Sequence, residues 1–310
     1  MKFTLSILFC FLPQLIFAQF FSGEITYQTE YIPKHDGVNI DSIKSAAMYS
    51  SNTYLITAGY YKSTYFKDGK ENYSYTYHDE TKFMYDEFEG KNYITYRDSR
   101  KPSEDSLSFK VYKDSLISVL GNKAFMVKSE DETTVTKTYY STEKRIDYKT
   151  FAGHEVANWY ARLEATNGSI MLKYIVEHED FFEISEAVKI KEYKPKRSEF
   201  DLPTNKPIVA SFTELDKMPE LKQATPSQIA CYQNRVQEAA KIENETTIVY
   251  VEFLLSDKGE VSNISTVEKD DYGFYKTAIS IIAKCGFSFS PGEIDGKAVS
   301  TVAYFPIRFD

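Results

Sequence analysis

The sequence predicts an α+β protein with two domains, an antiparallel β-sheet domain followed by a small α-β-β-α-β domain with a three-stranded sheet. The chain has 310 residues, a length that favours two domains. It contains 25 Tyr and 22 Phe against one Trp, and Tyr and Phe favour pleated surfaces. The hydrophobic pattern also changes from period two to helical spacing after a proline-rich stretch.

The first 18 residues have the pattern of a secretory signal peptide. Lys2 supplies the positive charge, an apolar run follows over 3–17, and the small Ala18 precedes Gln19. We expect cleavage after Ala18 and export, with no transmembrane segment afterwards. The alternative is an uncleaved anchor, although the run is short and interrupted for a membrane span.

Residues 19–194 are predicted to form the antiparallel β-rich domain. "GEITYQTEYI" alternates apolar and polar residues, as a half-buried strand does. Aromatic alternating runs predict hairpins at Asp68-Gly69, Glu89-Gly90 and Asn167-Gly168. The pattern gives about ten strands, and "HDGVNIDSIKSAAMYS" is compatible with one short helix.

Residues 195–211 are predicted to be a linker. They contain Pro195, Pro203 and Pro207 among mixed charges. Proline lacks the N–H that a sheet interior requires, so we expect this segment to stay outside the sheets.

Residues 212–310 are predicted to form the second domain. A helix begins near Thr225-Pro226, a hairpin turns at 257–259, and a second helix ends near Gly286. The apolar face of the second helix is expected to contain these residues: Tyr275, Ala278, Ile279, Ile282 and Cys285.

The chain ends in two turns and a long strand. Turns are expected at Pro291, Gly292, Asp295 and Gly296. In the strand, one side is expected to hold Val299, Thr301, Ala303, Phe305, Ile307 and Phe309, and the other Ser300, Val302, Tyr304, Pro306 and Arg308.

The second domain resembles the TonB-type C-terminal domain, a periplasmic module of energy transducers. The resemblance rests on "ELDKMPEL", "IVYVEFLLSDKGEVSNI" and "FSPGEIDGKAVSTVAYFPIRF", in that order. It implies that the last strand lies at the edge of the sheet, where a partner peptide can pair with it. The partner-binding edge would consist of Val299, Ser300, Thr301, Val302, Ala303, Tyr304 and Phe305. Alternatively, the strand only closes the core, and Pro306 guards against unwanted pairing.

The first domain resembles the GLPGLI-type exported proteins, which are similar to LolA-like half-barrels. The motifs are "GEITYQTEY", "SVLGNKAFMVKSE", "TKTYYSTEKRIDY" and "EFDLP". This resemblance implies a half-barrel-like sheet around apolar cargo. The aromatic stripes would then line a groove for a lipid-like ligand, or they would simply form the core.

Together, the two resemblances predict a periplasmic or outer-membrane-associated protein of a bacterial cell envelope. One hypothesis is that it binds extended segments of an envelope or outer-membrane transport protein by strand addition. The other is that it carries an apolar ligand. The two mature cysteines, Cys231 and Cys285, fall on helices expected to pack on one sheet, so they are either bridged or two buried thiols.

The sequence gives no catalytic or metal-binding constellation. His35, His78, His154 and His178 lack ligand spacing, and neither a nucleophile elbow nor a P-loop is present. We therefore expect no enzyme, no cofactor and no metal, with an unrecognised hydrolase as the remaining alternative. The net charge of -8 argues against a nucleic-acid partner.

Overall fold

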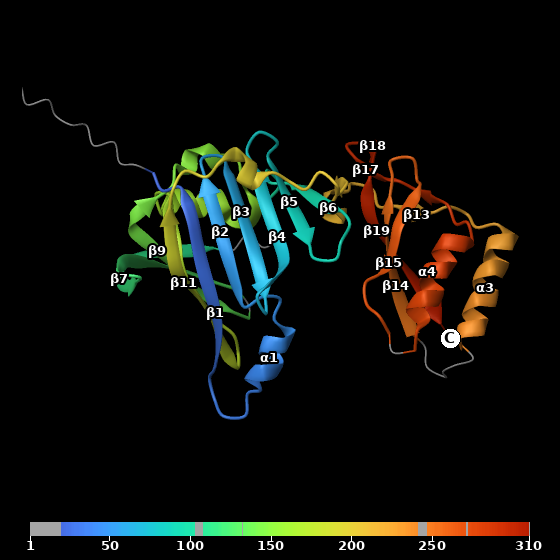
Figure 1. Ribbon diagram of the computed structural model, residues 1–310, viewed down its shortest axis with the longest axis horizontal. Helices are drawn as coiled ribbons and strands as arrows, with labels where there is room; N and C mark the ends of the chain where they lie inside the picture. Colours follow the sequence, from blue (N-terminus) through green and yellow to red (C-terminus); the bar gives the residue numbers. More distant parts are fainter. Residues whose placement is uncertain (1–19, 103–107, 132, 241–246, 271, 310) are drawn as a thin grey trace, which may run out of the picture.

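The computed structural model describes residues 20–102, 108–131, 133–240, 247–270 and 272–309. Two bodies lie side by side in Figure 1, a β-rich N-terminal domain and a C-terminal domain with two packed helices. The predicted α+β class is confirmed. The main sheet runs through both bodies in the order β15-β14-β19-β12-β6-β5-β4-β3-β2-β1-β11-β10-β9-β8-β7. The predicted signal peptide, residues 1–18, lies outside the described residues.

The N-terminal domain contributes eleven antiparallel strands to this sheet. They are β1 (Gly23–Pro33), β2 (Ser51–Thr57), β3 (Tyr60–Lys67), β4 (Lys70–His78), β5 (Phe83–Phe88), β6 (Ile94–Asp98), β7 (Phe109–Val119), β8 (Asn122–Glu130), β9 (Val135–Arg145), β10 (Ser169–Glu177) and β11 (Phe181–Glu192). Strand β1 pairs with both β2 and β11, so the first strand of the domain becomes a central one.

Two of the three predicted hairpins are confirmed. Asp68-Gly69 joins β3 to β4 with φ values of 51° and 75°, as a type I′ turn requires. Glu89-Gly90 lies in the connection from β5 to β6. The third prediction was wrong, because residues Trp159–Ala165 form helix α2 rather than a strand. Trp159 and Leu163 lie one helical turn apart and pack into the domain core, which favours helix over strand.

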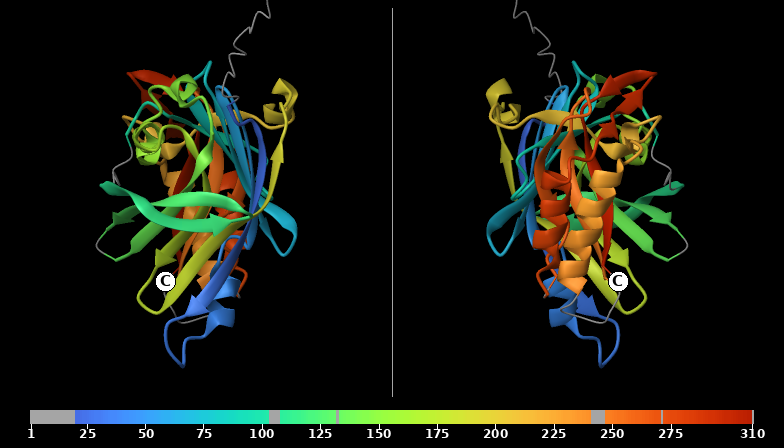
Figure 2. Two further views of the ribbon diagram at one scale, coloured as in Figure 1. Left: turned by 90° about the vertical axis from the view of Figure 1, so that its left-hand side faces the viewer. Right: turned by 90° about the vertical axis from the view of Figure 1, so that its right-hand side faces the viewer.

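The helices of this domain are short. They are α1 (Ile40–Ala46), which matches the helix expected in this segment, α2, and the 3₁₀ turns η1 (Tyr148–Phe151) and η2 (Val156–Asn158). Phe151 and Leu163 join one buried cluster with Ile25, Tyr27 and Tyr77 from the sheet. The segment 148–165 therefore covers one face of the sheet, as the left view of Figure 2 shows.

The predicted linker takes part in the fold. It contains η3 (Arg197–Phe200), whose Phe200 is fully buried, and strand β12 (Ile208–Ala210). The expectation that this stretch stays outside the sheets was wrong for β12. This strand pairs in parallel with β6 on one side and β19 on the other. Pro207 precedes the strand and accepts a hydrogen bond from Ile94 N through its carbonyl, so the ring costs no ladder bond.

The C-terminal domain has the predicted α-β-β-α-β order, with short additions. Its elements are η4 (Phe212–Glu214), β13 (Glu220–Leu221), α3 (Pro226–Ala240), β14 (Thr247–Leu255), β15 (Val261–Thr266), α4 (Phe274–Lys284), β16 (Phe289–Ser290), β17 (Gly292–Ile294), β18 (Lys297–Val299) and β19 (Thr301–Phe309). Helices α3 and α4 cover one face of the β15-β14-β19 part of the sheet (Figure 2, right). Between them lies a core of aliphatic and phenylalanine side chains.

Capping residues define the two C-terminal helices. Thr225 accepts a hydrogen bond from Gln228 N, and the Gln228 side chain accepts one from Thr225 N, which is a capping box. Gly286 follows α4 with φ 69°, as a helix-ending residue does. The buried face of α4 differs by one position from the prediction, because Ile281 is fully buried and Ile279 is only partly buried.

Candidate functional site

Strand β19 pairs with β14 along one edge. Its other edge is the candidate site, and among the described residues only part of that edge lacks a strand partner. Ala210 N donates to the Ser300 carbonyl (2.9 Å), and Thr301 Oγ1 donates to the Ala210 carbonyl (2.9 Å). Strand β12 thus occupies the beginning of this edge. Among the described residues, β19 has no strand partner on this edge beyond Thr301. The open stretch therefore starts later than the predicted Val299–Phe305 segment.

The main-chain groups of even-numbered β19 residues point toward this open edge. Tyr250 O accepts from Val267 N of the β15 side, so the Tyr250–Pro306 pair does not hydrogen-bond within the β14–β19 ladder. Successive residues of a strand direct their N–H and C=O groups to alternate edges. Tyr304 and Pro306 therefore turn theirs away from β14, whereas Ala303 and Phe305 turn theirs toward it.

Pro306 and Tyr232 shape the far part of the open edge. Pro306 lacks an N–H at a position that faces away from β14, so it weakens no bond of the existing sheet. Tyr232 OH donates to the Arg308 carbonyl (3.2 Å). The carbonyl of Pro306 and both main-chain groups of Tyr304 are the groups that this geometry presents to an incoming strand.

An apolar groove runs beside the open edge on the helix side. Its volume is about 230 Å³. Its walls are Leu221, Ala224, Ile229, Tyr232, Phe287, Phe305 and Pro306. Leu221 and Ile229 are exposed, at 39% and 45%. A strand added to β19 would direct alternate side chains into this groove.

The predicted turn residues position the start of β19. Asp295-Gly296 joins β17 to β18 with positive φ at both residues. Gly292 has no positive φ, and a Cβ added there would lie 2.9 Å from Leu215 Cδ1, so the end of the Leu215 side chain would have to shift. Pro291 lies between β16 and β17, and Val299 ends β18, where it pairs with Gly292. The turns therefore pack against residues 215–217, where Asp295 N donates to Asp216 Oδ2 (2.6 Å) and Glu293 N donates to the Lys217 carbonyl (3.0 Å).

The N-terminal domain covers the other face of β19 near its start. Val302 lies on the side of β19 opposite Thr301 and Ala303, as the alternation predicts, and is only 3% exposed, because it packs against Tyr93, Val209 and Leu254. The alternation does not predict this burial, since the sequence pattern of one domain does not reveal what the other domain covers.

A buried carboxylate joins the two domains. Glu252 of β14 is 3% exposed and accepts hydrogen bonds from Lys91 Nζ (2.7 and 2.8 Å) and Tyr93 OH (2.7 Å). Burial, followed by the bond to Glu252, raises the pKa of Tyr93. This cluster was not predicted from the sequence. Its only sequence signal is a glutamate inside the apolar run "IVYVEFLL", where a buried charge requires partners.

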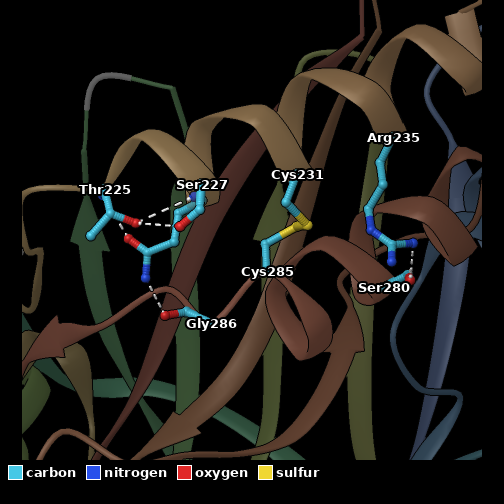
Figure 3. Close-up of a disulfide and its surroundings, with 8 residues drawn as sticks. Thr225, Ser227, Cys231, Arg235, Ser280, Cys285 and Gly286 are labelled. Carbon is cyan, nitrogen blue, oxygen red and sulfur yellow. Dashed lines mark hydrogen bonds between the residues drawn. A yellow bond between two sulfur atoms is a disulfide. The ribbon is translucent and has the colours of Figure 1, made fainter.

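The two predicted cysteines are bonded in the structure. Cys231 of α3 and Cys285 at the end of α4 have Cα atoms 5.6 Å apart, within the range that a disulfide spans. Figure 3 shows the bridge between the helices, with Arg235 Nη1 donating to Ser280 Oγ (2.9 Å) on its far side. Gln228 Nε2 also donates to the Gly286 carbonyl. These contacts hold α3, one wall of the groove, on α4.

The N-terminal domain contains a partly open cavity of about 180 Å³ between its sheet and α2. The wall combines tyrosine rings and hydroxyls with aliphatic side chains. Its residues are Ile25, Tyr27, Tyr49, Asn52, Tyr54, Ile56, Ser63, Tyr65, Tyr75, Tyr140, Ile146, Trp159, Arg162, Leu163, Ser169, Ile170, Met171 and Tyr174. The aromatic stripes of the sequence thus supply both a core and the lining of this cavity.

The histidines do not gather into a site. His154 is buried, and its Nε2 lies 2.5 Å from Tyr61 OH; burial lowers its pKa to about 4. His78 Nε2 lies 2.8 Å from the Phe200 carbonyl. Within the described parts of the chain, no group of three His, Cys, Asp or Glu side chains is arranged to hold a metal ion. Nor does any described helix have the length and apolar character needed to cross a membrane.

Comparison with known families gives one match. Residues 237–310 match the family model described as Gram-negative bacterial TonB protein C-terminal. The C-terminal domain is therefore similar to that family, over a shorter span than the predicted 212–310. No curated protein matches the chain.

Three solved structures that align with this chain have low similarity to it. PNGF-II aligns with 93% of this chain at 11% identity and a TM-score of 0.40, and the alignment spans 60% of that protein. The Mycobacterium tuberculosis lipoprotein LppX aligns with 56% of this chain and 89% of its own, at 6% identity and a TM-score of 0.26. MucB in complex with MucA(peri) aligns with 91% of this chain, and the alignment spans 88% of that protein, at 9% identity and a TM-score of 0.28. TM-scores this low do not establish a shared fold, so the GLPGLI-type resemblance stays a prediction.

Proposed function

We propose that this protein is a non-enzymatic component of a Gram-negative cell envelope. In this proposal its C-terminal domain binds an extended segment of an envelope or outer-membrane partner. The family match at residues 237–310 supports the location and the binding role. The expected export signal supports the location as well.

The observation that carries the proposal is the open stretch of β19 beside an apolar groove. Tyr304 presents an N–H and a C=O at this edge, and Pro306 presents a C=O. The groove next to them is lined by the exposed side chains of Leu221 and Ile229. Backbone pairing would supply affinity, and the groove would select an apolar side chain at alternate positions of the partner.

Substitutions at Tyr304 test the docking edge. Tyr304→Pro removes the N–H that faces the partner without removing a bond to β14, so capture of partners from an outer-membrane extract should fall about tenfold. Tyr304→Ala keeps the N–H and is the matched control. Pro306→Ala adds a donor to the same edge and should leave capture unchanged or raise it.

Folding of each variant is checked by circular dichroism and by retention of the Cys231–Cys285 bridge. Equal capture by wild type and by a folded Tyr304→Pro variant would refute strand addition at this edge. An equal loss of capture in Tyr304→Ala and Tyr304→Pro would instead assign the interaction to the tyrosine side chain, which both variants lack.

A second function, carriage of a lipid-like or other apolar ligand, is favoured by the cavity in the N-terminal domain. Native mass spectrometry of protein purified from its host tests it. A retained mass that disappears on denaturation is expected, and a bare chain after gentle purification would argue against carriage.

A further inference from the structure

The cavity of the N-terminal domain is large enough for a single aromatic ring. A buried cavity of about 150 Å³ is large enough to bind benzene, and this one measures about 180 Å³. A single aromatic ring or a short branched chain fills such a space.

The wall of the cavity is chemically mixed. Ile25, Ile56, Leu163 and Ile170 supply aliphatic surface, and tyrosine rings supply flat aromatic surface. Hydroxyl and amide groups of Asn52, Ser63 and Ser169 interrupt it. Empty cavities in proteins are apolar, and polar ones hold water or a ligand with polar groups. The ligand should therefore combine an apolar body with a polar end.

Arg162 is the one charged residue on this wall, and no carboxylate on the wall balances it. It lies on α2, is half-buried, and its Nη2 donates to the Ala157 carbonyl (2.6 Å). Its charge also reaches the wall residue Tyr140, where it opposes the rise that burial causes in the pKa of that hydroxyl. A guanidinium at the margin of a ring-sized cavity is suited to a carboxylate, which it can bind through two parallel hydrogen bonds.

We infer that this cavity binds a small carboxylate with an aromatic or branched apolar body, and that Arg162 pairs with the carboxylate. The inference rests on the second proposed function, ligand carriage, and narrows it to one chemical class. The body would lie among the tyrosine rings and Trp159, and the carboxylate would lie at the half-buried margin. This site is separate from the docking edge of β19.

Two probes of similar shape separate the contribution of the carboxylate to binding from that of the ring. Benzoate carries the charge, and benzyl alcohol is its neutral counterpart. Trp159 is the single tryptophan of the chain and lines the cavity, so its fluorescence reports occupancy directly. We expect benzoate to bind the full-length protein at least tenfold more tightly than benzyl alcohol, and isothermal titration calorimetry provides the second readout.

Arg162→Gln should remove the preference for benzoate, a loss of about tenfold or more, and leave the affinity for benzyl alcohol unchanged. Arg145→Gln is the matched control, because Arg145 Nη2 also donates to a main-chain carbonyl, that of Thr142 (3.4 Å), and lies outside the cavity wall. Ser63→Leu places an apolar side chain into the cavity and should abolish binding of both probes.

Each outcome decides between the proposals. Equal affinities of wild type for the two probes, or an Arg162→Gln variant that still prefers benzoate, would overturn the carboxylate assignment and leave carriage standing. Absence of binding by either probe, together with a bare chain in native mass spectrometry, would overturn both. Loss of probe binding in Arg145→Gln as well would show a nonspecific charge effect and would also overturn the assignment.

Discussion

The two domain cores are built from different side chains. The N-terminal core contains Tyr27, Tyr61 and Tyr77 and borders on the buried ring of His154, so hydroxyls and a ring nitrogen are packed among the apolar groups. The C-terminal core is aliphatic and phenylalanine-rich, and a disulfide closes it. A polar aromatic core leaves room and hydrogen-bonding groups for a ligand, whereas an apolar core that is cross-linked by a disulfide holds a strand edge rigid. The difference matches one proposed function to each domain.

The largest expected effect is on the stability of the C-terminal core. Phe253 is 1% exposed and packs with its ring 5.0 Å from that of Phe289. Phe253→Ala should lower the free energy of unfolding of the C-terminal domain by about 4 kcal/mol. Far-UV circular dichroism measures the loss, and Trp159 fluorescence tests whether the N-terminal domain unfolds separately. Phe88→Ala, at a 40% exposed position, is the control and should change stability little; similar losses for both would contradict the assignment of the core.

Removal of the disulfide should have the next largest effect. The bridge closes a loop with a sequence separation of 54, so in the chain-entropy model its loss should destabilise the C-terminal domain by up to about 4 kcal/mol. A Cys231→Ala/Cys285→Ala variant and reductant treatment of the wild type should give the same thermal midpoint. The N-terminal transition should not move. A thermal midpoint that is the same with and without reductant would show that the bridge contributes nothing to stability.

The stability of the N-terminal core should depend on pH, whereas that of the C-terminal core should not. Burial lowers the pKa of His154 to about 4 from 6.5. The folded domain therefore binds fewer protons than the unfolded chain between these values. The contribution of His154 is fully present above pH 6.5 and is lost as the pH falls toward 4, about 2 kcal/mol by pH 5.

Urea unfolding followed by Trp159 fluorescence at pH 7.5 and pH 5 measures this term. His154→Gln should lose the corresponding part of the pH dependence, even if its stability at pH 7.5 is already lower because the Tyr61 contact changes. An equally steep loss in the variant would assign the acid sensitivity to other groups.

The smallest expected effect concerns the contact between the two domains. Lys91→Met leaves the buried Glu252 with Tyr93 as its remaining hydrogen-bond donor among the contacts described. The Lys91 side chain is 29% exposed, so the loss should be about 1 to 2 kcal/mol, below that for a fully buried pair. Lys217→Met breaks the more exposed pair with Glu293 and should cost less. Chemical denaturation of both variants at one salt concentration makes the comparison; a larger effect at Lys217 would contradict the role of Glu252 at the junction.

The candidate site was only partly predictable from sequence. The turn at Asp295-Gly296 and the alternation along β19 follow from local patterns. The proximity of Cys231 and Cys285 follows from two helices that pack on one sheet, whereas the choice between a bridge and two thiols does not. The open part of the edge does not, because it depends on Ala210, a residue that lies 91 positions before Thr301. The cavity was also beyond prediction, because its wall draws Tyr27, Arg162 and Tyr174 from distant segments.

What the sequence determined by itself is the class and order of the elements. Period-two alternation marks strands, because side chains of a strand alternate between two faces, and capping signals mark α3 and α4. Tertiary structure decided that Trp159–Ala165 is helical, that β12 enters the sheet and that Val302 is buried. In each case the deciding energy comes from contacts between residues far apart in the chain, such as Glu252 with Lys91, and local patterns contain no record of those contacts.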